Sequence, residues 1–204
     1  MTSEMIYEWM RETLESKGYK VFEKGDYNVN LVAIRADDRR PLAFDDSLVC
    51  FYRVAREWRA HVWPCTTDPG TMLLHRPINP KGAAVLKPGQ YRGSHRLGLH
   101  KGRPALVQAS PVTVYRDNNR DDVIDYLDED TGHFGINIHD ASRYTIARNA
   151  ETASAGCIVL ANKLDMDSLL AVCKQSASVY GNSFTLTLIG QGDVETELFG
   201  GGHD

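Results

Sequence analysis

The sequence lacks the features that mark several large classes of protein. Its 204 residues include 23 Lys and Arg and 27 Asp and Glu, and a net charge of −4 gives no electrostatic basis for binding nucleic acid or an anionic membrane. No apolar run is long enough to cross a bilayer, and the first residues lack the basic and apolar regions of a secretion signal. We therefore expect synthesis in the cytoplasm, and neither a membrane nor a nucleic acid as a partner.

Cysteine is also scarce. The four cysteines are widely spaced and form no CxxC pair, so neither a disulfide framework nor a structural zinc site is expected. Cys50 lies in an apolar run and Cys173 on the apolar side of a predicted helix, which indicates core positions, whereas Cys65 precedes a turn and is predicted to end a strand. Cys157, by contrast, follows a turn of small residues.

The remaining pattern predicts a mainly β (α+β) fold, because most periodic segments alternate as strands do. We find no internal repeat and no interdomain linker. An N-terminal helix and strand elaboration is expected over 1–40, the main domain over 41–190 and a flexible tail over 191–204. The expected helices are 3–17 and 165–176, the second with Asp165 as N-cap, and the expected strands are 27–35, 48–54, 58–63, 105–109, 112–116, 134–139 and 183–189.

Cys157 ends a turn of small residues, Ser154-Ala155-Gly156-Cys157, eighteen positions after His139, which closes an alternating apolar segment. A thiol is a weak nucleophile at neutral pH, and a neighbouring imidazole corrects this by removing its proton. Gly156 permits a tight bend, and the amides of the turn are candidate donors to an oxyanion. The alternative is a buried structural cysteine and an unrelated histidine. If the pair is catalytic, we expect an apparent pKa of Cys157 below about 8.

The order of strand, histidine, loop, Ser-Ala-Gly-Cys, helix and final strand resembles the catalytic domain of L,D-transpeptidases, the YkuD-like family. The segment 86–91, Leu-Lys-Pro-Gly-Gln-Tyr, also looks like the family's Thr-Pro-x-Gly-x-Tyr segment. The resemblance covers roughly residues 45–190. It implies a β-sandwich or barrel with an N-terminal helix and one helix after the catalytic cysteine. The spelling Gly-Ile-Asn-Ile-His looks most like a divergent branch found in phage and prophage proteins.

The resemblance implies that Cys157 is the nucleophile, that His139 is its base and that the amides around Ala155 and Gly156, in the turn begun by Ser154, stabilise the oxyanion. The substrate would be a peptidoglycan stem peptide, attacked next to a diamino acid through a thioester and then transferred to an amine or to water. A phage enzyme without a secretion signal would reach the wall at lysis or on a particle. No cofactor is expected for this reaction.

Three positions depart from the family pattern. Ala155 stands where the family has a histidine, Val159 where it has an arginine, and Asp140 where a glycine follows the base. Arg143 or Arg148 would be the substitute cation near the substrate, and Asp140 is a candidate to orient the imidazole or contact the substrate. The alternatives are a catalytically inactive phage structural or cell-wall-binding protein of the same fold, and an unrelated cysteine protease.

Two other groups of residues are candidate ligand sites. Asp117, Asn119 and Asp121, with Asp125 and Asp128, are spaced like the ligands of a calcium loop, although Asp122 stands where a glycine makes the bend in such loops. A solvated acidic hairpin is the alternative. His95 and His100 are possible metal ligands without a third partner, and the alternative is that they lie on a loop or near the cleft.

Overall fold

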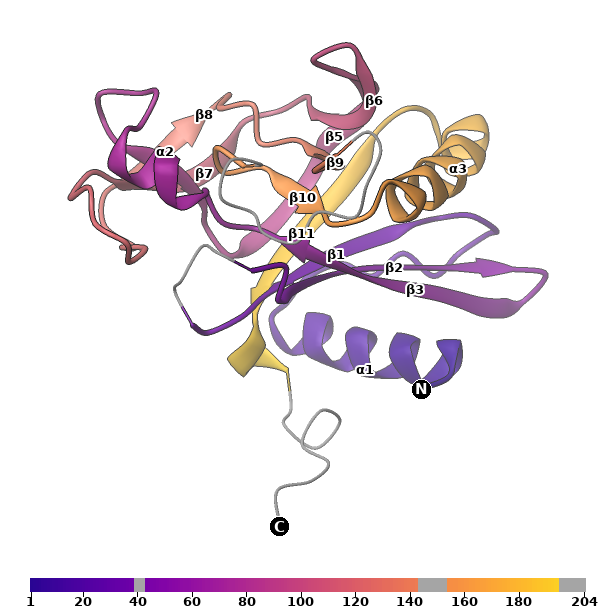
Figure 1. The fold of residues 1–204 in the computed structure, drawn as a ribbon. Coiled ribbons are helices and arrows are strands. Elements are labelled where there is room, and N and C mark those ends of the chain that lie inside the picture. Colours follow the sequence, from indigo (N-terminus) through magenta and orange to yellow (C-terminus); the bar gives the residue numbers. More distant parts are fainter. Residues whose placement is uncertain (39–42, 143–153, 195–204) are drawn as a thin grey trace.

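The computed structural model describes residues 1–38, 43–142 and 154–194 (Figure 1). The described residues are mainly β, with 39% in strands and 22% in helices, which confirms the predicted mainly β class. The helices are α1 (Ser3–Ser16), α2 (Thr71–His75), α3 (Lys163–Tyr180) and the 3-10 helix η1 (Gln191–Asp193). The strands are β1 (Asn30–Arg35), β2 (Asp46–Val54), β3 (Glu57–Thr66), β4 (Ala83–Leu86), β5 (Gly89–His100), β6 (Arg103–Gln108), β7 (Val112–Asp117), β8 (Glu129–Gly132), β9 (Ile138–Asp140), β10 (Ile158–Leu160) and β11 (Phe184–Gly190).

Eight strands close into a barrel in the order β1-β11-β5-β6-β9-β10-β3-β2. The pairs β1–β11 and β9–β10 are parallel, and the other neighbours are antiparallel. A separate sheet, β4-β7-β8, lies with α2 at one end of the molecule, away from α3 (Figure 1). None of the described helices has the length and apolar character needed to span a membrane.

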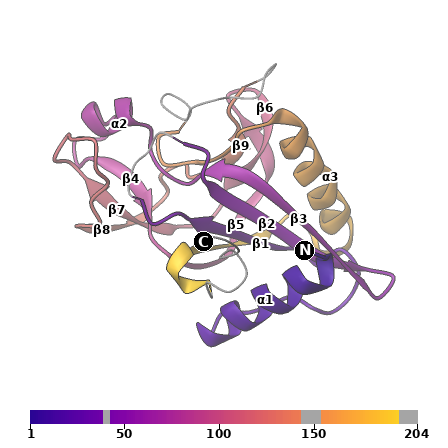
Figure 2. The same ribbon diagram turned by 60° about the horizontal axis from the view of Figure 1, so that its bottom comes forward.

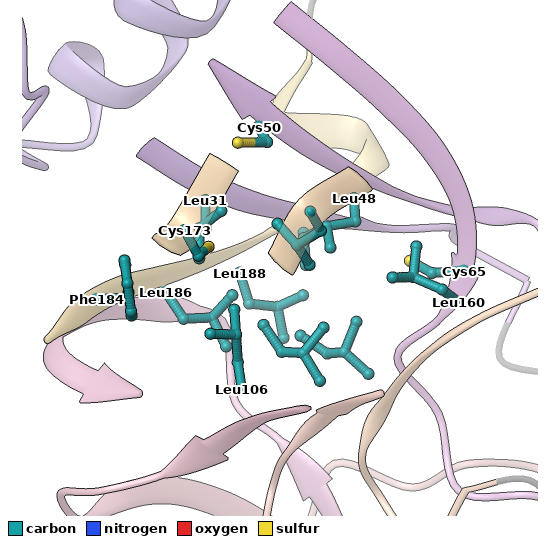
Figure 3. Close-up of a cluster of buried hydrophobic side chains, with 14 of the residues drawn as sticks. Leu31, Leu48, Cys50, Cys65, Leu106, Leu160, Cys173, Phe184, Leu186 and Leu188 are labelled. Atoms are coloured by element: carbon teal, nitrogen blue, oxygen red, sulfur yellow. The ribbon is translucent and has the colours of Figure 1, made fainter. Parts of the chain in front are cut away.

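The barrel core consists of aliphatic side chains from every wall of the barrel, joined by the apolar face of α3 (Figure 3). Leu48, Leu106 and Leu188 are fully buried in it. Cys50 and Cys173 belong to the same cluster, which confirms their predicted core positions; Cys65, near the end of β3, is equally buried. Burial without solvent contact raises the pKa of all three thiols.

Helix α1 covers the outer face of the barrel over β1, β2 and β3 (Figure 2). Its Met10 is fully buried and packs in a second cluster with Val32 and Phe51, while Tyr7 stacks on Trp58 at a centroid distance of 3.7 Å. The amphipathic pattern predicted this helix to within one residue. Strand β1 pairs with both β11 and β2, so the N-terminal segment forms part of the barrel wall.

Several local predictions were wrong. The strand expected over 134–139 begins only at Ile138, because Gly135 takes a φ of +73°, which a strand does not accommodate. Asn162, not Asp165, is the N-cap of α3, because its side chain accepts the amide of Leu164, and the helix continues to Tyr180. The tail begins with η1, and residues 195–204 lie outside the described part.

Strand β5 was not predicted at all. Its twelve residues include glycines and charged side chains, and its burial does not alternate regularly. It forms because β11 pairs along one edge and β6 along the other. His95 and His100 therefore lie on a strand of the barrel, not on a loop, and His100 lies beside the candidate site, against His139.

His95 is a buried structural histidine. Its Nε2 donates to the carbonyl oxygen of Ile136 at 2.9 Å, and its Nδ1 lies 2.8 Å from Ser94 Oγ. Burial lowers the pKa of His95 from 6.5 to about 4, and the bond to Ile136 offsets only part of this effect. The imidazole fixes the irregular segment before β9.

Acidification should therefore destabilise the fold through His95. In the unfolded chain His95 binds a proton near pH 6.5, whereas in the folded chain it binds one only near pH 4. The stability that neutral His95 contributes is therefore lost as the pH falls from about 6.5 to about 4. The shift corresponds to roughly 3 kcal/mol. The free energy of unfolding of the wild type and of His95→Gln should be measured in urea at pH 7 and at pH 4. The difference in this free energy between the two proteins should be smaller at pH 4 by about the amount given above. Groups common to both proteins cancel in this comparison, and an advantage that does not change with pH would contradict the assignment.

Candidate functional site

The parallel pairing of β9 with β10 brings the two predicted catalytic residues to neighbouring strands. Ile138 lies opposite Ile158, and His139 lies opposite Val159. The two isoleucines belong to the barrel core, and side chains alternate between the faces of a strand, so His139 is directed to the outer face. Cys157 directly precedes β10 and is diagonal to His139. The strand register thus places the thiol and the imidazole on one face of the barrel.

The turn before β10 is held by Ser154 and Gly156. Ser154 Oγ donates to the carbonyl of Cys157 at 2.8 Å and accepts the amide of Gly156 at 3.0 Å, while the carbonyl of Ser154 accepts the amide of Gly70 at 2.9 Å. Gly156 has a φ of +107°, and a Cβ built there would lie 2.1 Å from the carbonyl oxygen of Ala84. Glycine is required at position 156 for both reasons. The hydrogen bonds of Ser154 stabilise the turn and do not involve the thiol.

The sulfur of Cys157 has two polar neighbours. Sγ donates to the carbonyl of Gly135 at 3.2 Å and accepts the amide of Asn137 at 3.5 Å. Cys157 is 6% exposed, whereas the other three cysteines are fully buried, so this is the thiol that retains contact with solvent.

The protonation state of this thiol differs from the expectation. Burial raises the pKa of Cys157, and the lowering effects of the Asn137 amide and the Lys101 charge do not offset it. The expected pKa below about 8 is therefore wrong for the resting protein. Cys157 rests as a neutral thiol whose proton is directed to the carbonyl of Gly135.

His139 is arranged to act as a neutral base. Its Nδ1 contacts the carbonyl oxygen of Asp140 at 2.9 Å, and because a carbonyl only accepts, Nδ1 carries the proton and Nε2 keeps its lone pair. Burial lowers the pKa of His139, with smaller lowering effects from the charges of His100 and Arg103, while the bond and charge of Asp140 oppose the shift. The imidazole is uncharged at neutral pH and able to take a proton.

The thiol and the imidazole are not joined in this structure. Each has other partners among the described residues, and no hydrogen bond links Cys157 Sγ to His139 there. Diagonal neighbours on paired strands lie about 7–8 Å apart. Catalytic hydrogen bonds are often long in free enzymes and shorten when substrate binds. The expected hydrogen bond between nucleophile and base is therefore not formed in this structure.

Asn137 and His100 were not predicted to belong to this site. Asn137 supplies the amide that contacts Cys157, its Oδ1 accepts the amide of Gln108 at 2.9 Å, and its Nδ2 donates to His100 Nδ1 at 3.0 Å. His100 stacks on His139 with ring centroids 4.6 Å apart at 21°. Asn137 could have been recognised from the sequence, because it lies two residues before His139 and therefore on the same face of a strand. His100 could not, because its contact with His139 depends on the pairing of β5 with β6.

Asp140 contacts His139 through its backbone carbonyl. Its carboxylate is 5% exposed and forms an ion pair with Arg103, so it is engaged within the protein instead of facing a substrate. Arg143 and Arg148 lie outside the described residues. Val159 is fully buried, so no side chain at that position takes the place of the family's arginine.

The oxyanion donors also differ from the expectation. The amide of Gly156 is used by Ser154 Oγ, which removes it as a free donor. The amides of Ala155 and Cys157 donate to no other group in the ranges that the structure describes. These two amides are the remaining candidates for binding an oxyanion.

A groove of about 250 Å³ reaches the exposed Ala155. Leu73, Ile78 and Phe134 line it, and Arg116 is stacked over the Phe134 ring at 4.6 Å. The Arg116 guanidinium is already bound by Asp130 and the carbonyl of Gly82. The groove is therefore mainly apolar at the end nearest the turn.

No three His, Cys, Asp or Glu side chains in the described part of the chain converge closely enough to hold a metal ion. His95 and His100 do not share a site, because His95 binds Ile136 inside the barrel and His100 binds Asn137 on the outer face. The two histidines are thus accounted for by protein contacts.

The turn gives a direct test of the Gly156 requirement. Gly156→Ala introduces both an unfavourable φ and a clash with the backbone of Ala84, whereas Gly135→Ala introduces only a positive φ, because nothing lies within 4 Å of its Cβ position. Left-handed alanine costs about 1–2 kcal/mol. Denaturant unfolding should show a loss near that value for Gly135→Ala and a loss at least about 2 kcal/mol larger for Gly156→Ala. Equal losses would show that the turn can move away from β4.

The raised pKa of Cys157 predicts slow alkylation at neutral pH. The rate of iodoacetamide labelling, followed by mass spectrometry, should be below that of free cysteine at pH 7 and should rise about tenfold per pH unit up to at least pH 9. Cys157→Ser provides the background from the three buried thiols. His139→Ala should leave this profile unchanged, because no bond couples the two groups at rest. An apparent pKa below 8 that rises in His139→Ala would instead reveal a preformed thiolate–imidazolium pair.

Comparison with known proteins finds no relative of this chain. No family model, no curated protein and no solved structure matches the chain. The residues of the barrel face, Asn137, His139 and Cys157 with His100 beside them, are therefore the basis on which a function is assigned.

Proposed function

We propose that this protein carries out cysteine-dependent acyl transfer or hydrolysis on peptidoglycan stem peptides, with the L,D-transpeptidase-like chemistry that its sequence motif resembles. The observation that carries the proposal is the placement of Cys157, directly before β10, and His139, on the parallel neighbour β9, on one outward face, with His139 Nδ1 bound to the Asp140 carbonyl so that Nε2 carries the lone pair. The turn beside the thiol supports it, since the amides of Ala155 and Cys157 have no other acceptor among the described residues.

In the proposed reaction, a stem peptide enters along the groove that reaches Ala155. Cys157 Sγ attacks the carbonyl carbon while its proton passes to His139 Nε2, and the oxyanion is held by the amides of the turn. The imidazolium then returns the proton to the departing amine as the C–N bond breaks, which leaves a thioester on Cys157. An amine acceptor or water attacks the thioester and His139 accepts its proton; as the C–S bond breaks, the imidazolium returns that proton to Cys157 Sγ and the free thiol is restored.

The resting state fits a mechanism in which proton transfer accompanies attack. A neutral thiol and a neutral imidazole carry no charge into the buried face, so neither must be desolvated as an ion before substrate arrives. The stacked His100 ring restricts rotation of His139, and the Asp140 carbonyl fixes its tautomer.

A second candidate function is a wall-binding or particle protein of the same fold without turnover. The hydrogen bond from Sγ to the Gly135 carbonyl and the low exposure of Cys157 favour this alternative. In that case the groove would hold a peptide, and the thiol would remain unmodified.

The deciding experiment is incubation of the full chain with disaccharide tetrapeptides and, separately, with a carbapenem, followed by mass spectrometry of products and protein. We expect an acyl adduct confined to Cys157 and released D-residue. Cys157→Ala should abolish both, and His139→Ala should lower kcat by about 10²–10⁴-fold. Since the pKa of His139 is lowered from 6.5, the acidic limb of kcat/KM should lie below pH 6.5. His61→Ala is the matched control and should retain activity, because the His61 ring contacts Tyr52 and Trp63 and neither Cys157 nor His139. Peptide binding without any adduct would favour the second candidate function.

A further inference from the structure

The connection between β7 and β8 contains an arrangement that the proposed acyl transfer does not use. Asp117 ends β7 and is fully buried, yet its Oδ1 has no hydrogen-bond partner. Its Oδ2 accepts the amide of Asp125 at 2.8 Å, so the carboxylate is directed into the connection that follows. Leaving a buried carboxylate oxygen without a donor is costly, which indicates that a ligand satisfies it.

Three exposed or half-exposed side chains meet above this carboxylate. Asn119 Nδ2 donates to Asp121 Oδ2 at 3.0 Å and to Asp125 Oδ2 at 2.7 Å, so both carboxylates are held at one amide nitrogen. The amide nitrogen of Asn119 thus lies between two carboxylates, at a position that a cation could also occupy. No Lys, Arg or His of the described ranges forms an ion pair with Asp117 or Asp121.

We infer that this connection is a calcium site formed by Asp117, Asn119, Asp121 and Asp125, with the carbonyl of Val123 as a fifth ligand. These residues take positions 1, 3, 5, 9 and 7 of a loop in which alternate residues offer oxygen to a hard cation. In the described residues these three carboxylates are not arranged as a metal-binding group, so binding requires the two neutral oxygens and a rearrangement of the Asn119 bridge. Rotation of the Asn119 amide exchanges its nitrogen for its oxygen and turns the present bridge into a ligand.

Asp122 does not belong to this set, because it faces away from it. Its Oδ1 lies 2.7 Å from His75 Nε2, at the end of α2. Ile124 is fully buried against Leu74 of the same helix. The connection is therefore attached to α2, and Figure 1 shows both at the same end of the molecule. Since Leu73 of α2 lines the groove that reaches Ala155, a bound cation would hold the groove wall in place.

Calcium titration of the full chain by isothermal calorimetry tests this inference without any assay of turnover. We expect one site with a Kd of about 10⁻⁴–10⁻³ M, as in extracellular calcium modules, and much weaker binding of Mg²⁺. Calcium at 10 mM should raise Tm by about 4 °C relative to EDTA.

Asp121→Asn is the informative variant, because Asp121 is exposed and its loss leaves the buried Asp117 untouched. It should weaken calcium binding at least tenfold, whereas Asp122→Asn, which removes the same charge one residue away, should change the Kd less than twofold. Equal effects of the two variants would reduce the binding to general attraction by an acidic surface. Absence of heat and of a Tm shift at 10 mM calcium would overturn the site, and neither outcome depends on whether Cys157 is catalytic.

Discussion

The hydrogen bonds that pair β10 with β9 in parallel hold the candidate site together. They are formed by two strands of only three residues each, placed between the longer β6 and β3 in the closed barrel. Because Ile138 and Ile158 are anchored in the core, the opposite faces of both strands are directed outward in fixed register. A slip of one residue would exchange the core and the reactive face.

Buried polar contacts stabilise the irregular backbone around these short strands. His95 binds the carbonyl of Ile136 from inside the barrel, and Asn137 is bound through Gln108 and His100 on the outside. The turn before β10 is held by Ser154 and by the close approach of Gly156 to β4. Positioning of the thiol therefore depends on contacts from four separate stretches of chain.

The electrostatic state of this face is neutral at rest. Burial favours the uncharged forms of both Cys157 and His139, and the Arg103–Asp140 ion pair satisfies the nearest carboxylate. The β7–β8 connection differs, since it gathers negative charge beside α2. A mainly apolar groove lies between α2 and the turn, so the two chemically distinct regions meet at its walls.

The sequence by itself determined the elements whose periodicity reports burial. The 3.6-residue pattern of α1 follows from the need to bury one face, and the apolar runs of β2, β3 and β11 follow from burial in the barrel. The Ser-Ala-Gly-Cys turn was visible as a run of small residues with a glycine, and the φ of +107° at residue 156 accounts for that glycine. Only the tertiary structure decided the course of β5, the break at Gly135, the raised pKa of Cys157 and the stacking of His100 on His139. These depend on strand partners and burial from distant residues, which local periodicity does not encode.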